Sequence, residues 1–274
     1  VQTFEQDTDS AAVYGQAIYP LSDRLSLTTG IRYTYEKKEF TGTQVLADGT
    51  PNPAYDFFDD MSANEVTWRA AVDFAATDSV LLYASAATGF RSGGFNGNAI
   101  ARSDIAGGGF GVEDSFTIEG GVKSELFENK LRLNMNYFYT EYDNLQQAIT
   151  RSDGTIATSN SQATVHGLEA ELKALPAKGL AIGVTLGSMF DDIKDSDLTL
   201  SNAPEWSFRV DGAYTFRVPG LAGSLRIAGD VSYRTNSFTG GTNNPFSATG
   251  DYEIVNANLT YETDDQHWAL TLAG

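Results

Sequence analysis

The chain of 274 residues carries 36 acidic against 18 basic residues, a formal net charge of −18. Such a charge repels phosphate backbones, so nucleic-acid binding is excluded as a function. The lack of cysteine excludes disulfide scaffolds, thiolate zinc sites and cysteine nucleophiles. No apolar run approaches the ~20 residues of a membrane-spanning helix, whereas 27 Gly, 13 Tyr and 16 Phe indicate a β-rich fold. Residues 1–10 are polar and unlike a signal peptide, so we expect an excised piece or a mature fragment.

Apolar and polar side chains alternate with a period of two, which predicts β-strands. The alternation is clearest where four apolar residues share one face, which we expect to point outward: Val66, Trp68, Val72 and Phe74. Arg69 and Asp73 occupy the opposite face, and a helix would scatter the two sets. The pattern predicts about twelve strands, near residues 9–21, 25–40, 63–76, 80–89, 114–125, 131–147, 163–174, 180–193, 204–216, 224–238, 251–263 and 267–274.

The connections between these strands alternate between short and long. Short turns are expected near residues 22–24, 77–79, 127–130, 176–179, 218–223 and 264–266. Longer polar connections are expected near 41–62, 90–113, 148–161, 194–203 and 239–250. Strict alternation of this kind predicts an antiparallel up-and-down meander in which all long connections lie at one end.

Two all-β architectures can cover an apolar strand face. A soluble sandwich or barrel buries that face inside, whereas an outer-membrane barrel turns it toward lipid. Many of the expected strands run about 12 to 16 residues, longer than the ~5–6 of globular sheets. Their second face carries charges of both signs, such as Arg132, Arg209 and Asp230, which suits a wet lumen, and aromatic residues cluster near strand ends. The sequence therefore favours a transmembrane barrel.

Three segments carry a resemblance to a known family. Residues 81–96 read LLYASAATGFRSGGFN, residues 116–131 read FTIEGGVKSELFENKL, and residues 163–172 read ATVHGLEAEL. All three resemble recurrent elements in the barrels of TonB-dependent outer-membrane receptors, of the siderophore and iron-complex type. The resemblance extends over essentially the whole chain and is weakest in the loops. The chain is thus identified as the C-terminal part of such a barrel.

The resemblance implies a complete barrel of about 22 strands, of which these would be roughly strands ten to twenty-one. The short turns would be periplasmic and the long loops extracellular. Residues 1–274 would form a partial barrel domain, without the family's plug domain and final strand.

In function, the resemblance implies active uptake of a scarce ligand, usually a ferric siderophore, in the outer membrane of a Gram-negative bacterium. Extracellular loops would capture the ligand, and the TonB complex would act through the plug. The implied partners are therefore the TonB complex, the ferric siderophore and outer-membrane lipid, without nucleic acid and without a cofactor.

The glycine-rich segment at residues 89–96 is the main candidate site. The residues that would line a ligand path are Arg91, Ser92, Gly93, Gly94, Phe95 and Asn96. Arg91 could meet an anionic ferric chelate, and glycine permits close approach of the backbone. Alternatively, the glycines and aromatic residues shape the top of a strand and pin the adjoining loop, and this structural role is preferred.

Carboxylates form the remaining candidates. Glu169 and Glu171 share a face with Gly167, so they could face the plug from the lumen wall or be simply solvated. His166 falls on the opposite face and alone makes no metal site. A weak calcium candidate is the acidic cluster of Asp191, Asp192, Asp195 and Asp197. It lacks the spacing of an EF-hand loop, so a solvated loop is the preferred interpretation and no metal site is predicted.

The sequence predicts no enzyme. Its two histidines, His166 and His267, belong to strands far apart in sequence, and no G-x-S-x-G motif is present. A passive outer-membrane channel would share every periodicity argument but not the motifs above. An outer-membrane enzyme would need a nucleophile and a histidine close together in the lumen.

Overall fold

A computed structural model describes residues 1–53, 56–96, 109–150, 156–194 and 198–274. The strands are β1 (Gln2–Ser22), β2 (Leu25–Gln44), β3 (Phe57–Thr77), β4 (Val80–Arg91), β5 (Glu113–Leu126), β6 (Leu131–Thr150), β7 (Ile156–Ala177), β8 (Leu180–Ile193), β9 (Trp206–Phe216), β10 (Gly223–Arg234), β11 (Tyr252–Thr263) and β12 (Ala269–Ala273). A short 3-10 helix, η2 (Pro245–Ser247), lies between β10 and β11. Among the described residues, no helical segment has the length and apolar composition of a membrane span.

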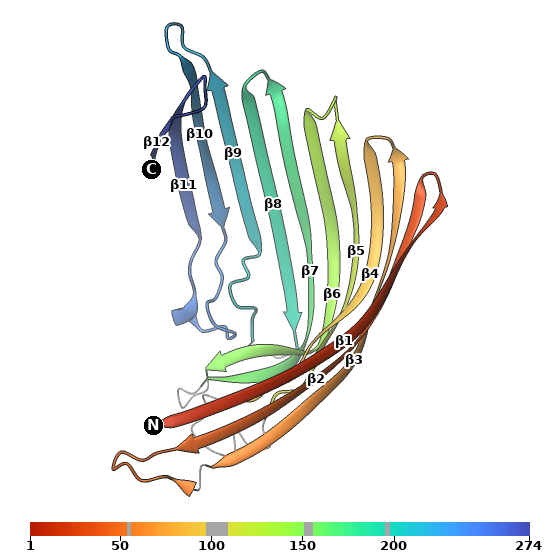
Figure 1. Ribbon diagram of the computed structural model, residues 1–274, viewed down its shortest axis with the longest axis vertical. Helices are drawn as coiled ribbons and strands as arrows, with labels where there is room; N and C mark the ends of the chain where they lie inside the picture. The colour runs from red at the N-terminus through yellow and green to blue at the C-terminus, as the bar shows by residue number, and fades with distance from the viewer. Residues whose placement is uncertain (54–55, 97–108, 151–155, 195–197) are drawn as a thin grey trace.

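All twelve strands form one antiparallel sheet in sequence order, as the alternation predicted. In the described part of the chain, β1 pairs with β2 alone and β12 with β11 alone, so the sheet is open and curved like part of a barrel wall (Figure 1). The short turns lie together at one end of the sheet, and the strand ends that lead into the long connections lie at the other. Each inner strand pairs with its two sequence neighbours, whereas β1 and β12, as far as the chain is described, are each paired along one edge only.

The two faces of the sheet differ as the period-two pattern requires. On the apolar face, Val66 is 56% and Phe74 43% exposed, although both are large apolar side chains. We call this face the outward face. The other face, which carries Arg209 and Asp230 paired at 3.3 Å, is the lumen face. An apolar surface of this extent needs a partner other than water.

Aromatic side chains form a belt across the outward face near the long-connection end. Successive ring contacts of 5.6–6.3 Å between centroids join Tyr137, His166, Phe190, Trp206, Phe208 and Tyr233, from β6 to β10. Trp68 of β3 and Phe116 of β5 make a similar contact at 6.2 Å. We call these eight residues the upper belt.

A second set of rings lies near the short turns, where Tyr214 and Phe216 stack at 5.4 Å. Strand β9 runs from Trp206 in the upper belt to Phe216 in this lower belt over 11 residues. At about 3.3 Å per residue and a tilt of about 40°, the belts are ~25 Å apart, the height of the apolar band of outer-membrane barrels.

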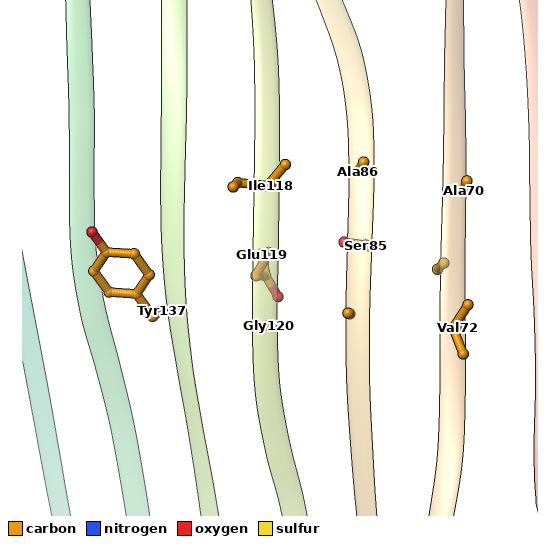
Figure 2. Close-up of a pocket in the computed structure, with 10 residues that line it drawn as sticks. Ala70, Val72, Ser85, Ala86, Ile118, Glu119, Gly120 and Tyr137 are labelled. Atoms are coloured by element: carbon orange, nitrogen blue, oxygen red, sulfur yellow. The ribbon is translucent and has the colours of Figure 1, made fainter.

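A shallow hollow of about 440 Å³ lies on the sheet between the belts. Figure 2 shows its small residues, Ala70, Ala86 and Gly120, on three adjacent strands, with the ring of Tyr137 leaning to one side. The hollow exists because small residues sit beside larger ones on the outward face. It faces away from the lumen and is therefore no part of a ligand path.

Two clusters of buried apolar side chains lie beyond the upper belt, at the long-connection end. We call this part of the molecule, formed by the strand ends and connections past the belt, the collar. One buried cluster centres on Phe40 and Phe57, with Phe4 and Phe95 packed against it. The other comprises Leu145, Ala163, Ile193 and Leu198. The collar thus has small buried cores of its own. The rest of the sheet, which we call the wall, is a single layer.

The strands extend further into the collar than the sequence predicted. β1 begins at Gln2 instead of near residue 9, β3 at Phe57 instead of near 63, and β7 at Ile156 instead of near 163. The apolar alternation stops in these segments, but the hydrogen-bonded ladder continues, for example at Gln2 opposite Gln44. In contrast, β10 ends at Arg234, where residues 235–238 turn into the next connection.

Candidate functional site

Arg91 is the last residue of β4 and lies opposite Glu113 of β5. The register places both on the lumen face, because Glu119 and Lys123 of β5 follow Glu113 at even spacing. The side chain of Arg91 is exposed. None of the ion pairs found among the described residues involves Arg91, so its positive charge is available at the mouth of the lumen.

The next residues turn inward and are held by β2. Lys38 Nζ donates to Ser92 Oγ and to the carbonyl oxygen of Gly93, both at 2.7 Å. Ser92 Oγ in turn donates to Glu36, whose carboxylate lies 3.2 Å from Lys38 Nζ. Lys38 and Glu36 are only 17% and 19% exposed, so this ion pair is shielded from water far more than an ordinary surface pair.

The two glycines are required by close backbone approach. Gly94 exchanges two hydrogen bonds with Phe110, at 3.1 and 2.9 Å. A Cβ on Gly93 would lie 2.5 Å from the carbonyl oxygen of Phe110, and a Cβ on Gly94 would lie 2.5 Å from the Phe110 ring. A larger residue at position 93 would push the two ends of the β4–β5 connection apart, and one at position 94 would displace the Phe110 ring.

Phe95 and Asn96 complete the attachment. The ring of Phe95 stacks on Phe40 at 5.0 Å, and Phe40 lies 5.6 Å from both Phe4 and Phe57. Asn96 Oδ1 accepts a hydrogen bond from the Thr158 backbone at 2.7 Å. Five consecutive residues of the candidate segment, Ser92 to Asn96, are therefore held against the collar, and Arg91 is the one residue of the six that is exposed.

A cavity of about 190 Å³ lies between this segment, β2 and β3. Its lining is Glu36, Lys38, Met61, Ser62, Ala63, Ser92, Gly93, Phe110, Gly111 and Val112. The cavity is smaller than typical ligand pockets of ~300–1,000 Å³. Its two charged lining residues, Glu36 and Lys38, form an ion pair with each other.

The two predicted lumen carboxylates lie on the wall, away from Arg91. Glu169 is exposed and accepts a hydrogen bond from Asn136 Nδ2 at 3.2 Å. Glu171 forms an ion pair with Lys173 at 2.5 Å. Both lie on the lumen face beside Gly167, whereas His166 lies on the outward face, where its Nδ1 is 3.2 Å from the Tyr137 hydroxyl.

The acidic cluster is only partly described. Asp191 and Asp192 lie on alternate faces just before the last residue of β8, Ile193, whereas Asp195 and Asp197 lie outside the described residues. In the part of the chain that the structure describes, no group of three or more potential metal ligands comes together.

The whole sequence, residues 1–274, matches the family model described as "TonB dependent receptor-like, beta-barrel". The chain belongs to the TonB-dependent receptor family. The family is one of transporters and receptors, not of enzymes, and its members are β-barrels of the Gram-negative outer membrane.

Solved structures share this fold at low sequence identity. The ferric yersiniabactin uptake receptor FyuA from Yersinia pestis superposes with a TM-score of 0.82 and 20% identity, over 96% of this chain and 40% of FyuA. The siderophore receptor PiuA from Acinetobacter baumannii gives 0.74 and 17%, over 98% and 39% of the two chains. The copper transporter OprC gives 0.76 and 14%, over 97% and 41%. The chain thus spans about two fifths of the length of these structures.

The sequence pointed to residues 91–96 as a candidate segment, but not to the side chains that hold this segment in place. The residues that sequence reasoning missed are Glu36 and Lys38 on β2, and Gln146 and Asn160 on the β6–β7 hairpin. They lie more than 30 positions from the groups of the β4–β5 connection that they bind. No local pattern distinguishes them from ordinary polar residues of a strand.

Proposed function

We propose that this chain is part of an outer-membrane receptor of a Gram-negative bacterium that takes up a ferric siderophore with energy supplied through TonB. The family match over residues 1–274 is the observation that carries the proposal. Siderophore receptors among the structural neighbours, such as FyuA and PiuA, support the ligand class. OprC, named as a copper transporter, makes a copper ligand the second candidate.

The arrangement of the sheet supports a membrane position. The apolar band between the two belts has the height of a bilayer core, and tyrosine, tryptophan and histidine rings suit its polar boundaries. The outward face would then contact lipid. The collar would project from the membrane on the extracellular side, and the short turns would lie in the periplasm.

Within this arrangement the chain's own residues have separate tasks. The collar presents Arg91 at the lumen mouth, where a guanidinium can pair with an anionic chelate through charge-assisted hydrogen bonds. Glu169 and Glu171 would face the plug from the lumen wall. No bond is made or broken in the ligand, so affinity and opening of the path determine the rate.

Growth under iron limitation tests the proposal. We expect a strain that lacks the complete gene to lose growth on one class of ferric siderophore, and depletion of TonB to give the same loss in the parent strain. Uptake that continues without TonB would identify a passive channel. Loss of copper accumulation with unchanged iron uptake would establish the second candidate.

Arg91→Ala examines the ligand contact itself. We expect weaker growth on the ferric siderophore at unchanged receptor abundance, because a guanidinium–anion contact contributes roughly 1.5–3 kcal/mol. The control is Arg132→Ala, which removes a cation paired with Glu125 near the short turns. If Arg91→Ala grows like wild type, Arg91 does not contact the ligand, and if abundance falls with growth, its role is structural.

A further inference from the structure

The outer part of the β6–β7 hairpin changes direction after a bulge. The register shifts between Tyr142 and Leu145, and Asn144 has a positive φ of 58°. Bulges bend the strand that contains them. Beyond this point the hairpin runs across the direction of the other strands (Figure 1), which brings Gln146 against the β4–β5 connection.

Gln146 binds both ends of that connection through its side-chain amide. Its Nε2 donates to the carbonyl oxygens of Arg91 at 3.3 Å, Ser92 at 3.0 Å and Gly111 at 3.0 Å. The side chain is buried, with the residue 8% exposed. Its Oε1 has no hydrogen-bond partner among the described residues, so this amide is placed to satisfy backbone carbonyls at the expense of its own oxygen.

The backbone of Gln146 binds Glu113, the residue opposite Arg91 on β5. The Gln146 N–H donates to Glu113 Oε2 at 2.6 Å. Opposite charges directly across an antiparallel pair ordinarily attract each other, and Glu113 is the residue opposite Arg91. Here the carboxylate is directed to the hairpin instead, and the described ion pairs do not include Arg91 with Glu113. The guanidinium thereby stays unneutralised.

We propose that Gln146 is a positioning residue that fixes the backbone of Arg91 and, with Glu113 held away, presents an unpaired guanidinium to an anionic ferric chelate. The inference takes the identity of the ligand from the proposed function. The positioning of Arg91 by Gln146 does not depend on that function. A residue already fixed in its binding geometry loses less conformational freedom when the ligand arrives. Loss of the amide therefore reduces affinity through Arg91 and not through a contact of its own.

The first experiment needs no ligand. A nitroxide is attached at Arg91→Cys in the full-length receptor, after any cysteines elsewhere are replaced, since this chain has none. We expect Gln146→Ala and Gln146→Glu to increase the label's mobility, because the first removes the donors and the second directs a carboxylate at backbone carbonyls. The matched control is Gln147→Ala, which alters the adjacent glutamine, also buried.

The second experiment measures affinity in a double-mutant cycle. The probes are an anionic ferric tris-catecholate and a neutral ferric tris-hydroxamate, titrated against purified receptor whose folding is checked by electrophoresis without heating. We expect Gln146→Ala to bind the anionic chelate about tenfold more weakly and to cause no further loss in an Arg91→Ala background. Gln146→Asn, which keeps a shorter amide, should retain part of the affinity.

The outcomes separate the inference from the proposed function. An unchanged nitroxide spectrum in Gln146→Ala overturns the positioning role, whichever chelate binds. An equal loss of affinity with and without Arg91 also overturns it, because Gln146 would then act by another route. If neither chelate binds the wild-type receptor, the ferric-siderophore proposal fails, and the spectra alone decide whether Gln146 positions Arg91.

Discussion

The wall and the collar of this receptor barrel are stabilised in different ways. In the wall, adjacent strands are joined by backbone ladders, and most large apolar side chains point outward and are exposed. In the collar, Phe40 and Phe57 are 5% and 7% exposed, and side chains bind backbone groups from distant strands. The apolar surface of the wall therefore needs a partner other than water, whereas the collar buries its apolar side chains against one another. Substitutions should affect the two parts separately.

The largest expected effect is in the collar. Phe40→Ala removes the ring that contacts Phe4, Phe57 and Phe95, and such substitutions cost about 3–5 kcal/mol. We expect the collar to open locally while the wall remains inserted. Trypsin should then cleave at Lys37 or Lys38 in folded receptor, detected by mass spectrometry.

The control for that experiment is Phe58→Ala on the outward face, where the ring is 60% exposed and little packing is lost. A Phe40→Ala receptor that no longer reaches the outer membrane would show that wall and collar fold as one unit. The comparison between them would then be wrong.

A smaller loss is expected in the wall. Val210→Arg places a charge on the outward face between the belts, where Val210 is 51% exposed, and such a change costs ~2–4 kcal/mol near the bilayer midplane. Asn258→Arg places the same charge on the lumen face and should cost much less. Urea unfolding in lipid vesicles measures both, and equal losses would contradict the assignment of the faces.

How far the sequence predicts the molecule differs between the same two parts. The wall was predictable because each side chain of a strand points to one of two faces. The apolar residues Val66, Trp68 and Val72 indicate which face points away from the lumen. Short turns and long loops then fixed the order of the strands. The antiparallel meander follows from these local facts without knowledge of any distant contact.

The collar was less predictable because its contacts join segments far apart in sequence. The ladder of β1 continues through Thr3 to Asp9, a run in which Phe4 is the one apolar residue and no alternation is visible. The hairpin bend depends on the bulge at Asn144, and a single Asn gives no such signal in a chain rich in polar residues. The motif made Arg91 a candidate, but no sequence pattern pointed to Gln146, whose amide binds the carbonyl oxygen of Arg91.

The smallest expected effect concerns the boundary between wall and collar. Tryptophan at a membrane interface is stabilised by its amphipathic ring, and each aromatic contact adds about 0.5–1.5 kcal/mol. Trp206 stacks on Phe208 at 6.0 Å and meets Phe190 edge-on at 5.6 Å. Trp206→Leu keeps an apolar side chain but loses both contacts, so we expect a loss of roughly 1 kcal/mol in vesicle unfolding.

Tryptophan depth tests the same boundary directly, since the chain has three tryptophans. In single-tryptophan receptors, lipids brominated near the headgroup should quench Trp206 and Trp68 more than lipids brominated at the chain ends, because the upper belt lies at an interface. Trp268, which is 76% exposed beside the short turns, should respond in the same way from the other leaflet. Stronger quenching of Trp206 from the chain ends would show that the upper belt lies in the bilayer core. The boundary between wall and collar would then lie beyond the belt, closer to Arg91.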